Sequence, residues 1–209
     1  MKSIIALTLM GVLSMSATPA KAGDEEQPKY KVVLSEEDFE IRDYEAYYVV
    51  STVYDTEKGE STGDGFRKLF KYISGENKTE QKIEMTAPVT TSEDTSQKIE
   101  MTAPVTISEN AGKRKMTFMV PSRFYNTSIP EPTNPDVKIE KIEAQTRAVI
   151  KFSWYAGDSK KEDKSKLLLK WIESKGYTPL EKPFYAGYNS PYALPWLRTN
   201  EMIVRVNKR

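Results

Sequence analysis

The 209-residue sequence contains no cysteine and no histidine. Ser-His-Asp and Cys-His catalytic arrangements are therefore impossible, and a zinc site would lack its usual nitrogen and sulfur ligands. Redox chemistry of a thiol is excluded as well, and without disulfides the chain must be stabilised by packing, which its length permits. Acid–base catalysis would depend on Asp, Glu, Lys or Tyr, and a metal ion on oxygen, Met or Lys ligands.

The sequence also has almost no excess of charge of either sign. Lys and Arg total 31, Asp and Glu total 30, and the formal net charge is +1. Two of the bases, Lys2 and Lys21, lie in the first 22 residues, which contain no acid, so the rest of the chain carries 29 bases and 30 acids. A near-neutral protein has no global electrostatic reason to bind nucleic acid or an anionic membrane, and we expect no nucleic-acid partner.

Long apolar runs are absent except near the start of the chain. Lys2 precedes an apolar run from Ile4 to Leu13, which is about half the length of a membrane-spanning helix. Ala20-Lys21-Ala22 then supplies the small residues of a cleavage site. We predict a signal peptide over residues 1–22, cut after Ala22, and hence a periplasmic or secreted protein. Residues 23–29 are predicted to be a flexible lead-in, and residues 30–209 a single domain.

One segment occurs twice. Residues 81–90 have the sequence Gln-Lys-Ile-Glu-Met-Thr-Ala-Pro-Val-Thr, and residues 97–106 repeat the same ten letters. Apolar residues alternate with polar ones in each copy, which predicts a half-buried strand. Pro88 and Pro104 lack an amide hydrogen, so we expect each at a strand end or on a sheet edge. Two copies are too few for a solenoid, and we favour a local duplication over two equivalent binding sites.

Alternation of apolar and polar residues predicts further strands along the chain. Two of them adjoin a turn at Glu45-Ala46, and we expect these two to be neighbours in the sheet. The predicted strands are residues 30–34, 39–44, 47–54, 115–120, 137–142, 148–154 and 202–206.

Two segments have the spacing of amphipathic helices. Phe66, Leu69, Phe70 and Ile73 fall at i, i+3, i+4 and i+7, which predicts a helix that ends near Gly75. A second helix is expected to begin with a capping box over residues 159–162, to bury Leu168, Trp171 and Ile172, and to end at Gly176. Two helices among strands with short connections indicate an α+β domain, in which both helices pack against an antiparallel sheet.

Five blocks of the sequence are informative when taken together and in order. The core block is Lys-Ile-Glu-Met-Thr-Ala-Pro-Val at residues 82–89. The other blocks are Phe39–Tyr44, Phe66–Gly75 with Asn77, Phe118–Pro121, and Asn200-Glu201 with Arg198. These blocks resemble the SOUL family of haem-binding proteins, and the resemblance extends over residues 30–207, which is essentially the whole predicted mature chain.

The resemblance implies a distorted, barrel-like antiparallel sheet made of two pseudo-symmetric halves, each with one packed helix. It also implies non-covalent binding of haem or a free-base tetrapyrrole in an apolar groove near the first helix and a late loop, with basic side chains at the propionates. Some members are proposed to use a histidine as axial ligand, which this chain lacks. Arg198 is followed by Thr199 where the family often has two arginines, and Leu194 stands where some members have a lysine.

We therefore predict binding of haem or porphyrin by a monomer, with no catalytic residue and no metal ligand. Contact with apolar side chains would contribute about 25 cal/mol per Å² of ring removed from water, and basic side chains would pair with carboxylates. The candidate ligand-binding residues are Arg67, Lys71, Tyr192, Leu194, Trp196 and Arg198.

Three other functions are compatible with the sequence. A binding module for another small apolar or cationic ligand would be indicated by a carboxylate, such as Glu84 or Glu100, at the base of its pocket. An envelope stress or interaction protein could bind haem incidentally. A hydrolase or isomerase would need paired acids, and the spacing of Glu40, Asp43 and Glu201 does not demand a pair, so we favour a protein that is not an enzyme.

Overall fold

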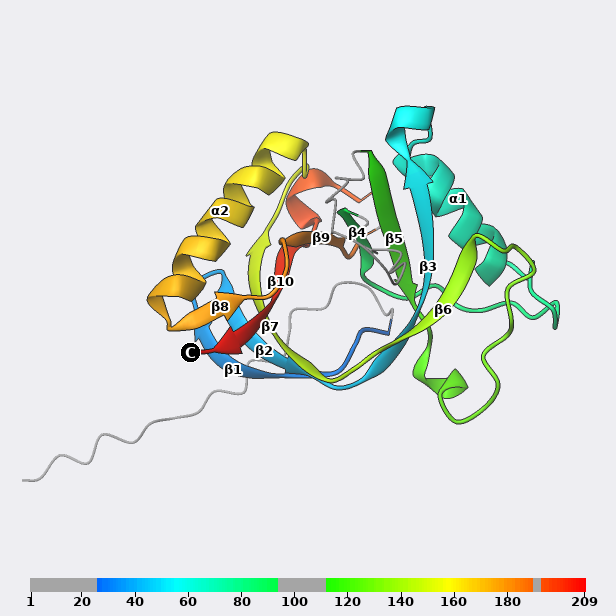
Figure 1. The fold of residues 1–209 in the computed structure, drawn as a ribbon, viewed down its shortest axis with the longest axis horizontal. Helices are drawn as coiled ribbons and strands as arrows, with labels where there is room; N and C mark the ends of the chain where they lie inside the picture. Colours follow the sequence, from blue (N-terminus) through cyan, green and yellow to red (C-terminus); the bar gives the residue numbers. More distant parts are fainter. Residues whose placement is uncertain (1–25, 94–111, 190–192) are drawn as a thin grey trace, which may run out of the picture.

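The structure is a computed structural model that describes residues 26–93, 112–189 and 193–209 (Figure 1). The second copy of the repeated segment, the predicted signal peptide and Tyr192 lie outside these residues. Ten strands form one curled antiparallel sheet, and two α-helices flank it, as expected for an α+β domain. No helix in the described ranges is long and apolar enough to cross a membrane.

Nine of the strands follow one another across the sheet in the order β1-β2-β7-β10-β9-β4-β5-β3-β6, and β8 pairs with β10. The sequence predicted most of them from apolar residues that recur at alternate positions. Their bounds are β1 Tyr30–Glu36, β2 Phe39–Tyr44, β3 Tyr47–Asp55, β4 Val89–Glu93, β5 Lys113–Met119, β6 Val137–Ile142, β7 Gln145–Phe152, β8 Tyr177–Pro179, β9 Phe184–Gly187 and β10 Asn200–Lys208.

The expected pairing around Glu45-Ala46 is wrong. β2 pairs with β1 and β7, whereas β3 pairs with β5 and β6. The chain therefore continues from β2 through residues 45–46 into β3 without forming a hairpin, and in doing so it passes from one half of the molecule to the other. We call this β2–β3 segment, and the β6–β7 segment beside it, the two long strand paths. β6 and β7 return along the same path, with Tyr47 opposite Ile142 and Tyr44 opposite Gln145. These two paths join the pseudo-symmetric halves (Figure 1).

Each half has one helix on the outer, convex side of the sheet (Figure 1). α1 (Thr62–Ile73) packs against β3, β5 and β6, and α2 (Asp158–Ser174) packs against β7, β8 and β10. α1 begins earlier than Phe66 because the Asp64 carboxylate accepts a hydrogen bond from the Ser61 backbone N–H at 2.9 Å. The capping box predicted over residues 159–162 is wrong: Gly157 occupies the N-cap, and Ser159 already lies in the helix.

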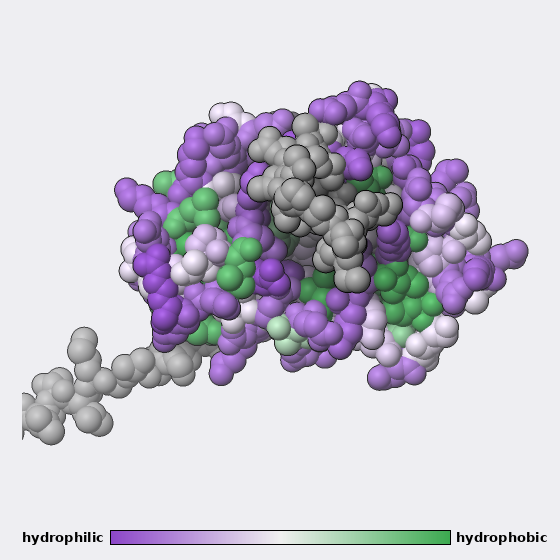
Figure 2. Space-filling view, in the orientation of Figure 1, coloured by the Kyte–Doolittle hydropathy of each residue, from purple (hydrophilic) through white to green (hydrophobic). Residues whose placement is uncertain are grey.

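Two apolar cores lie between the helices and the sheet. Val50, Leu69 and Phe118 are buried in the α1 core, and Ile41, Ile150 and Leu168 in the α2 core. In the orientation of Figure 1 the surface is mainly hydrophilic, and its apolar residues appear in small separate groups (Figure 2). The two helix-covered cores therefore hold most of the buried large apolar side chains.

The first copy of the repeated segment is a strand only at its end. Residues 81–88 belong to no strand, and β4 begins at Val89, directly after Pro88, as the missing amide hydrogen of proline predicts. Ile83 and Ala87 are buried, as the alternation predicts, but Met85 is exposed. The neighbouring Thr86 is buried instead, where its hydroxyl donates to the Met119 carbonyl at 2.5 Å.

Candidate functional site

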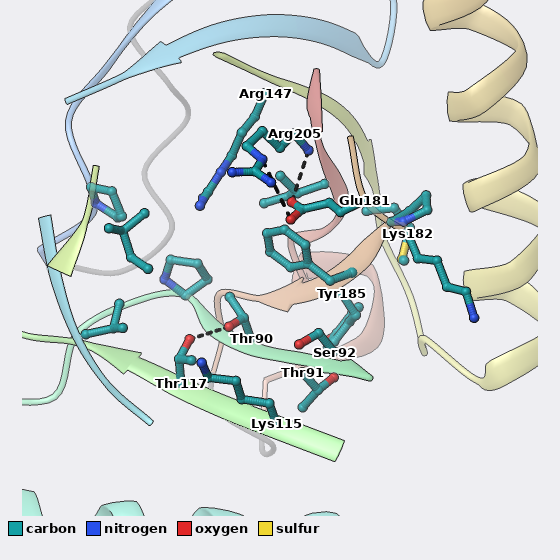
Figure 3. A pocket seen from close by; sticks show the side chains of 18 of the residues that line it. Thr90, Thr91, Ser92, Lys115, Thr117, Arg147, Glu181, Lys182, Tyr185 and Arg205 are labelled. Carbon is teal, nitrogen blue, oxygen red and sulfur yellow. Dashed lines mark hydrogen bonds and ion pairs between the residues drawn. The ribbon is translucent and has the colours of Figure 1, made fainter. Parts of the chain in front are cut away.

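The concave face of the sheet, opposite the two helices, encloses a cavity of about 1050 Å³. Strands from both halves line it, so the cavity exists only because the long strand paths bring the halves together. Its lining side chains shown in Figure 3 come mainly from β4, β5, β7, β9 and β10. This cavity is a candidate binding site.

Aromatic rings form one part of the cavity wall. Tyr44, Tyr47 and Tyr188 are buried, and Tyr30 and Phe184 are partly buried beside them. Such rings offer large, rigid contact area, and the tyrosine hydroxyls add polar groups. The wall therefore suits a flat apolar ligand that also carries polar substituents.

Three arginines stand side by side across three adjacent strands. Arg42 on β2 lies opposite Arg147 on β7, and Arg147 in turn lies opposite Arg205 on β10. Residues directly opposite each other on neighbouring strands point to the same face, here the concave one. Like charges in that arrangement repel, so the row is stable only if anions neutralise it.

Arg42 is fully neutralised inside the protein. Its Nη2 and Nη1 donate to the two carboxylate oxygens of Glu201 at 2.7 and 3.1 Å, and its Nε donates to Glu40 at 2.6 Å. The Tyr188 hydroxyl also donates to Glu201. Burial and the nearby Glu201 carboxylate raise the pKa of Tyr188 well above its ordinary value, so its hydroxyl keeps its proton.

Arg147 has no such partner. Its side chain is aimed into the cavity (Figure 3), and the residue is only 8% exposed. Nη1 donates to the Tyr47 hydroxyl at 2.8 Å, but Nε is buried without a hydrogen-bond acceptor. Within the described ranges no carboxylate lies at ion-pair distance from Arg147. A buried cation that lacks a counter-charge is costly, and this one faces open space where an anion would fit.

Several other basic side chains of the cavity differ from Arg147 in having protein carboxylates beside them. Lys115 donates to Glu140 at 2.7 Å, and the Arg205 Nε lies 3.9 Å from Glu181. Burial alone would raise the pKa of Glu140, but its hydrogen bonds from Lys115 and Ser51 outweigh burial and lower it. Arg147 is buried as well, so it is a position in the wall where an anionic group from a ligand would be strongly stabilised.

The residues predicted from the sequence fall into two separate groups. Arg67 and Lys71 lie on the exposed side of α1, where they form ion pairs with Asp64 and Glu76, each at 3.6 Å. The hollow around them, about 450 Å³, is lined almost entirely by charged side chains. The apolar character expected for a groove at the first helix is therefore not what surrounds these two residues.

Leu194, Trp196 and Arg198 lie in and next to a short 3-10 helix, η3 (Pro195–Leu197), that precedes β10. The Trp196 ring contacts Trp154, which follows β7, and the Arg198 guanidinium lies 4.8 Å from the Tyr155 ring centroid. These contacts attach the loop to the half that carries α2, whereas Arg67 and Lys71 belong to the half that carries α1. Neither group includes the arginine row.

Arg42 and Arg147 were not predicted from the sequence as site residues. Arg42 lies between Ile41 and Asp43, and Arg147 between Thr146 and Ala148, so the local sequence gives little sign that either side chain faces the interior. In the described part of the chain no cluster of Asp and Glu side chains is arranged to hold a metal ion. The cavity can therefore provide ring contacts, hydroxyl groups and the guanidinium of Arg147 to a ligand.

Comparisons with known proteins identify the family. The family model described as SOUL heme-binding protein matches residues 25–96 and 91–205, and the chain belongs to the SOUL family. The repeated segment lies where these two matched stretches meet. Heme-binding protein 2 of Mus musculus and of Homo sapiens are each 32% identical over 158 residues, which is 75% of this chain and 72% of the relative.

Solved structures with low sequence identity share the fold. The C-terminal domain of EcmrR superposes with a TM-score of 0.52 at 14% identity, covering 86% of this chain and 99% of that domain. An uncharacterized conserved protein from Listeria innocua gives a TM-score of 0.55 at 12% identity, covering 81% of this chain and 92% of that protein. These similarities support the two-half α+β architecture.

Proposed function

We propose that this protein binds haem or another tetrapyrrole non-covalently in the concave cavity, with a ligand carboxylate on Arg147. The observation that carries the proposal is the buried, unneutralised Arg147 beside aromatic rings in a cavity of about 1050 Å³. Membership of the SOUL family and the 32% identity to Heme-binding protein 2 support the ligand class.

Two interactions provide the affinity. Placing a flat ring against Tyr44, Tyr47 and Phe184 removes apolar surface from water, at about 25 cal/mol per Å² before ordering costs. A propionate on Arg147 forms a charge-assisted hydrogen bond in a site where water competes poorly. The buried guanidinium is already held in place, so little side-chain entropy is lost when the carboxylate arrives.

Iron plays a minor part in this binding. The chain has no histidine, so affinity depends on ring contact and carboxylate pairing. We expect haem and iron-free protoporphyrin to bind with similar affinity, because both have the same ring and the same two propionates.

Two of the other functions receive less support. A cationic ligand would need a free carboxylate, but Glu201, the buried acid of the concave face, is engaged by Arg42 and Tyr188. Glu40 and Glu201 both accept hydrogen bonds from the same guanidinium, so neither carboxylate is free to act on a substrate as a catalytic acid or base. We therefore propose a binding protein and not an enzyme.

The location and the activity are tested by titrating haem and iron-free protoporphyrin into residues 23–209. We expect a Soret shift with haem and fluorescence changes with the porphyrin, both weakened in Arg147→Met. The alternative binding site is the surface predicted from the sequence, which includes Lys71 and Arg198. The double variant Lys71→Ala, Arg198→Ala tests that site. Absence of a signal with either ligand would contradict the function, whereas weakening only in the second variant would move the site.

We also propose that the protein is exported and acts as a monomer. The predicted leader over residues 1–22 supports export. N-terminal sequencing of protein from a periplasmic or culture fraction should begin at Gly23, and a chain that retains Met1 would contradict cleavage.

A further inference from the structure

A second surface lies away from the arginine row and is unusually apolar for exposed positions. Two short segments, residues 154–155 and 194–197, contribute the side chains of what we call the aromatic patch. Each of the patch side chains is 51% to 62% exposed, and they make up five of the eleven exposed large hydrophobic residues in the described part of the chain. The patch consists of Trp154, Tyr155, Leu194, Trp196 and Leu197.

Backbone hydrogen bonds hold the two segments together. The Trp154 N–H donates to the Pro195 carbonyl at 2.9 Å, and the buried Asn200 donates from Nδ2 to the Trp154 carbonyl at 2.8 Å. The Trp154 and Trp196 ring centroids are 6.4 Å apart. Trp154 has a φ of +74°, a left-handed conformation that bulky residues rarely adopt. The surrounding bonds therefore maintain a strained backbone that leaves this ring exposed.

Basic side chains border the aromatic patch. Lys160 and Lys164, one turn apart on α2, lie with their Nζ atoms 5.6 and 5.9 Å from the centroid of Phe152, and Lys160 donates to the Ser153 carbonyl. On the patch itself, the Arg198 guanidinium lies over Tyr155.

The acids of the first turns of α2 do not cancel this charge. Asp158 is paired with Lys161 and Glu162 with Lys166. Asp158 and Glu162 both line the concave cavity, so they lie on a different flank of the helix from Lys160 and Lys164. Within the described residues, Lys160 and Lys164 have no carboxylate at ion-pair distance.

We propose that the aromatic patch docks on the surface of an anionic phospholipid bilayer. Trp and Tyr side chains favour the headgroup region, where the ring contacts acyl chains and the polar atom stays hydrated. Lys and Arg around such rings are attracted to anionic headgroups, whereas lysine is depleted in protein–protein interfaces. The attraction is local, since the chain as a whole is nearly neutral, and the contact is peripheral and reversible.

Co-sedimentation with vesicles tests the proposal. Residues 23–209 are mixed with vesicles of phosphatidylcholine alone or of phosphatidylcholine with phosphatidylglycerol. We expect the unmodified protein to bind the anionic vesicles. The affinity for them should fall by about tenfold or more in the double variant Trp154→Ser, Trp196→Ser. The double variant Lys160→Glu, Lys164→Glu should lose the preference for anionic lipid. Leu180→Ser removes an exposed apolar side chain outside the patch and should bind as the unmodified protein does.

Circular dichroism and thermal unfolding identify variants that fail to fold, and tryptophan fluorescence gives an independent readout. Two of the three tryptophans are in the aromatic patch, so anionic vesicles should shift the emission to the blue, and less so in Trp196→Phe. No binding to anionic vesicles, or equal binding by the folded Trp154→Ser, Trp196→Ser variant, would overturn the proposal. The proposal would also be overturned if the patch substitutions changed the molar mass in sedimentation equilibrium and left vesicle binding unchanged. The aromatic patch would then bind a second copy of the chain.

Discussion

Arg42 and Arg147 lie directly opposite one another on β2 and β7, yet only Arg42 has carboxylate partners within the described chain. The fold thus buries two like charges side by side and neutralises one of them. A ligand carboxylate on Arg147 would neutralise the second. Binding and stability are therefore linked at this residue.

Replacing Arg147 by Met should weaken ligand binding and strengthen the fold. A charge-assisted hydrogen bond contributes about 1.5–3 kcal/mol, so the affinity for a tetrapyrrole with propionates should fall by about 10- to 100-fold. The free energy of unfolding without ligand should rise by about 1–2 kcal/mol, because a buried unpaired donor and a repulsion from Arg42 both disappear. Fluorescence titration and urea unfolding measure the two effects.

Arg205→Met is the matched control for that variant, because Arg205 belongs to the same row but is more exposed and has Glu181 nearby. It should change both quantities only slightly. If Arg147→Met instead destabilised the fold as a core truncation does, Arg147 would be a structural residue.

Replacing Glu201 by Gln should destabilise the protein by about 3–5 kcal/mol, because Arg42 would stay buried with half of its charge compensation lost. Removing both charges, in Arg42→Met with Glu201→Leu, should recover much of that loss. The coupling is obtained from urea unfolding of Arg42→Met, Glu201→Leu and the double variant. Strictly additive effects would show that the buried pair is not a unit.

Acid should destabilise the protein partly through Glu40. Burial alone would raise the pKa of Glu40, but the hydrogen bond from Lys151 and the charge of Arg42 outweigh burial and lower the pKa below its ordinary value of 4.5. The folded state thus binds this proton less readily than the unfolded state does. The stabilisation from Glu40 is complete above the unfolded pKa and is lost as the pH falls through the folded pKa.

Glu40→Gln should therefore cost about 2 kcal/mol at neutral pH and progressively less below about pH 4.5. Glu84→Gln, which neutralises an exposed carboxylate, should cost little at any pH. Chemical unfolding of the three proteins from pH 7 to pH 3 measures the difference. A constant gap between Glu40→Gln and the unmodified chain would contradict this account.

Much of the fold could be predicted from the sequence because burial on one side of a strand or helix is a local pattern. β2, β3, β6 and α1 were found in this way. The pattern does not say which strand pairs with which. We therefore predicted that the strands on either side of residues 45–46 pair with each other, whereas β2 and β3 pair with different strands. Met85 and Thr86 broke the alternation because the buried Thr86 hydroxyl has an acceptor in the Met119 carbonyl.

The candidate site was harder to predict because it depends on register. Arg42, Arg147 and Arg205 are far apart in sequence and become neighbours only through the pairing of β2, β7 and β10. In addition, the concave face encloses a cavity, so a polar residue in a strand does not necessarily face bulk solvent. The residues chosen from family resemblance, such as Lys71 and Trp196, are on exposed helix and loop positions, and their role in ligand binding stays a prediction.

Shortening the connection between β4 and β5 should leave the fold intact. Deleting residues 94–109 would leave four residues, 110–113, between the paired Glu93 and Arg114, and Gly112 among them has a positive φ (+89°) that suits a tight hairpin loop. Closing a shorter loop costs less entropy, so the free energy of unfolding should rise by about 1–2 kcal/mol. Thermal and urea unfolding measure this change, and a clear loss of stability would show that the deleted residues contribute to packing.

The most direct test of the central claim compares protoporphyrin with its dimethyl ester, which has the same ring and no free carboxylates. The unmodified protein should prefer the diacid by about tenfold or more, and Arg147→Met should show almost no preference. A preference that survives in Arg147→Met, or one that disappears only in Lys71→Ala with Arg198→Ala, would contradict the assignment of the concave cavity as the binding site.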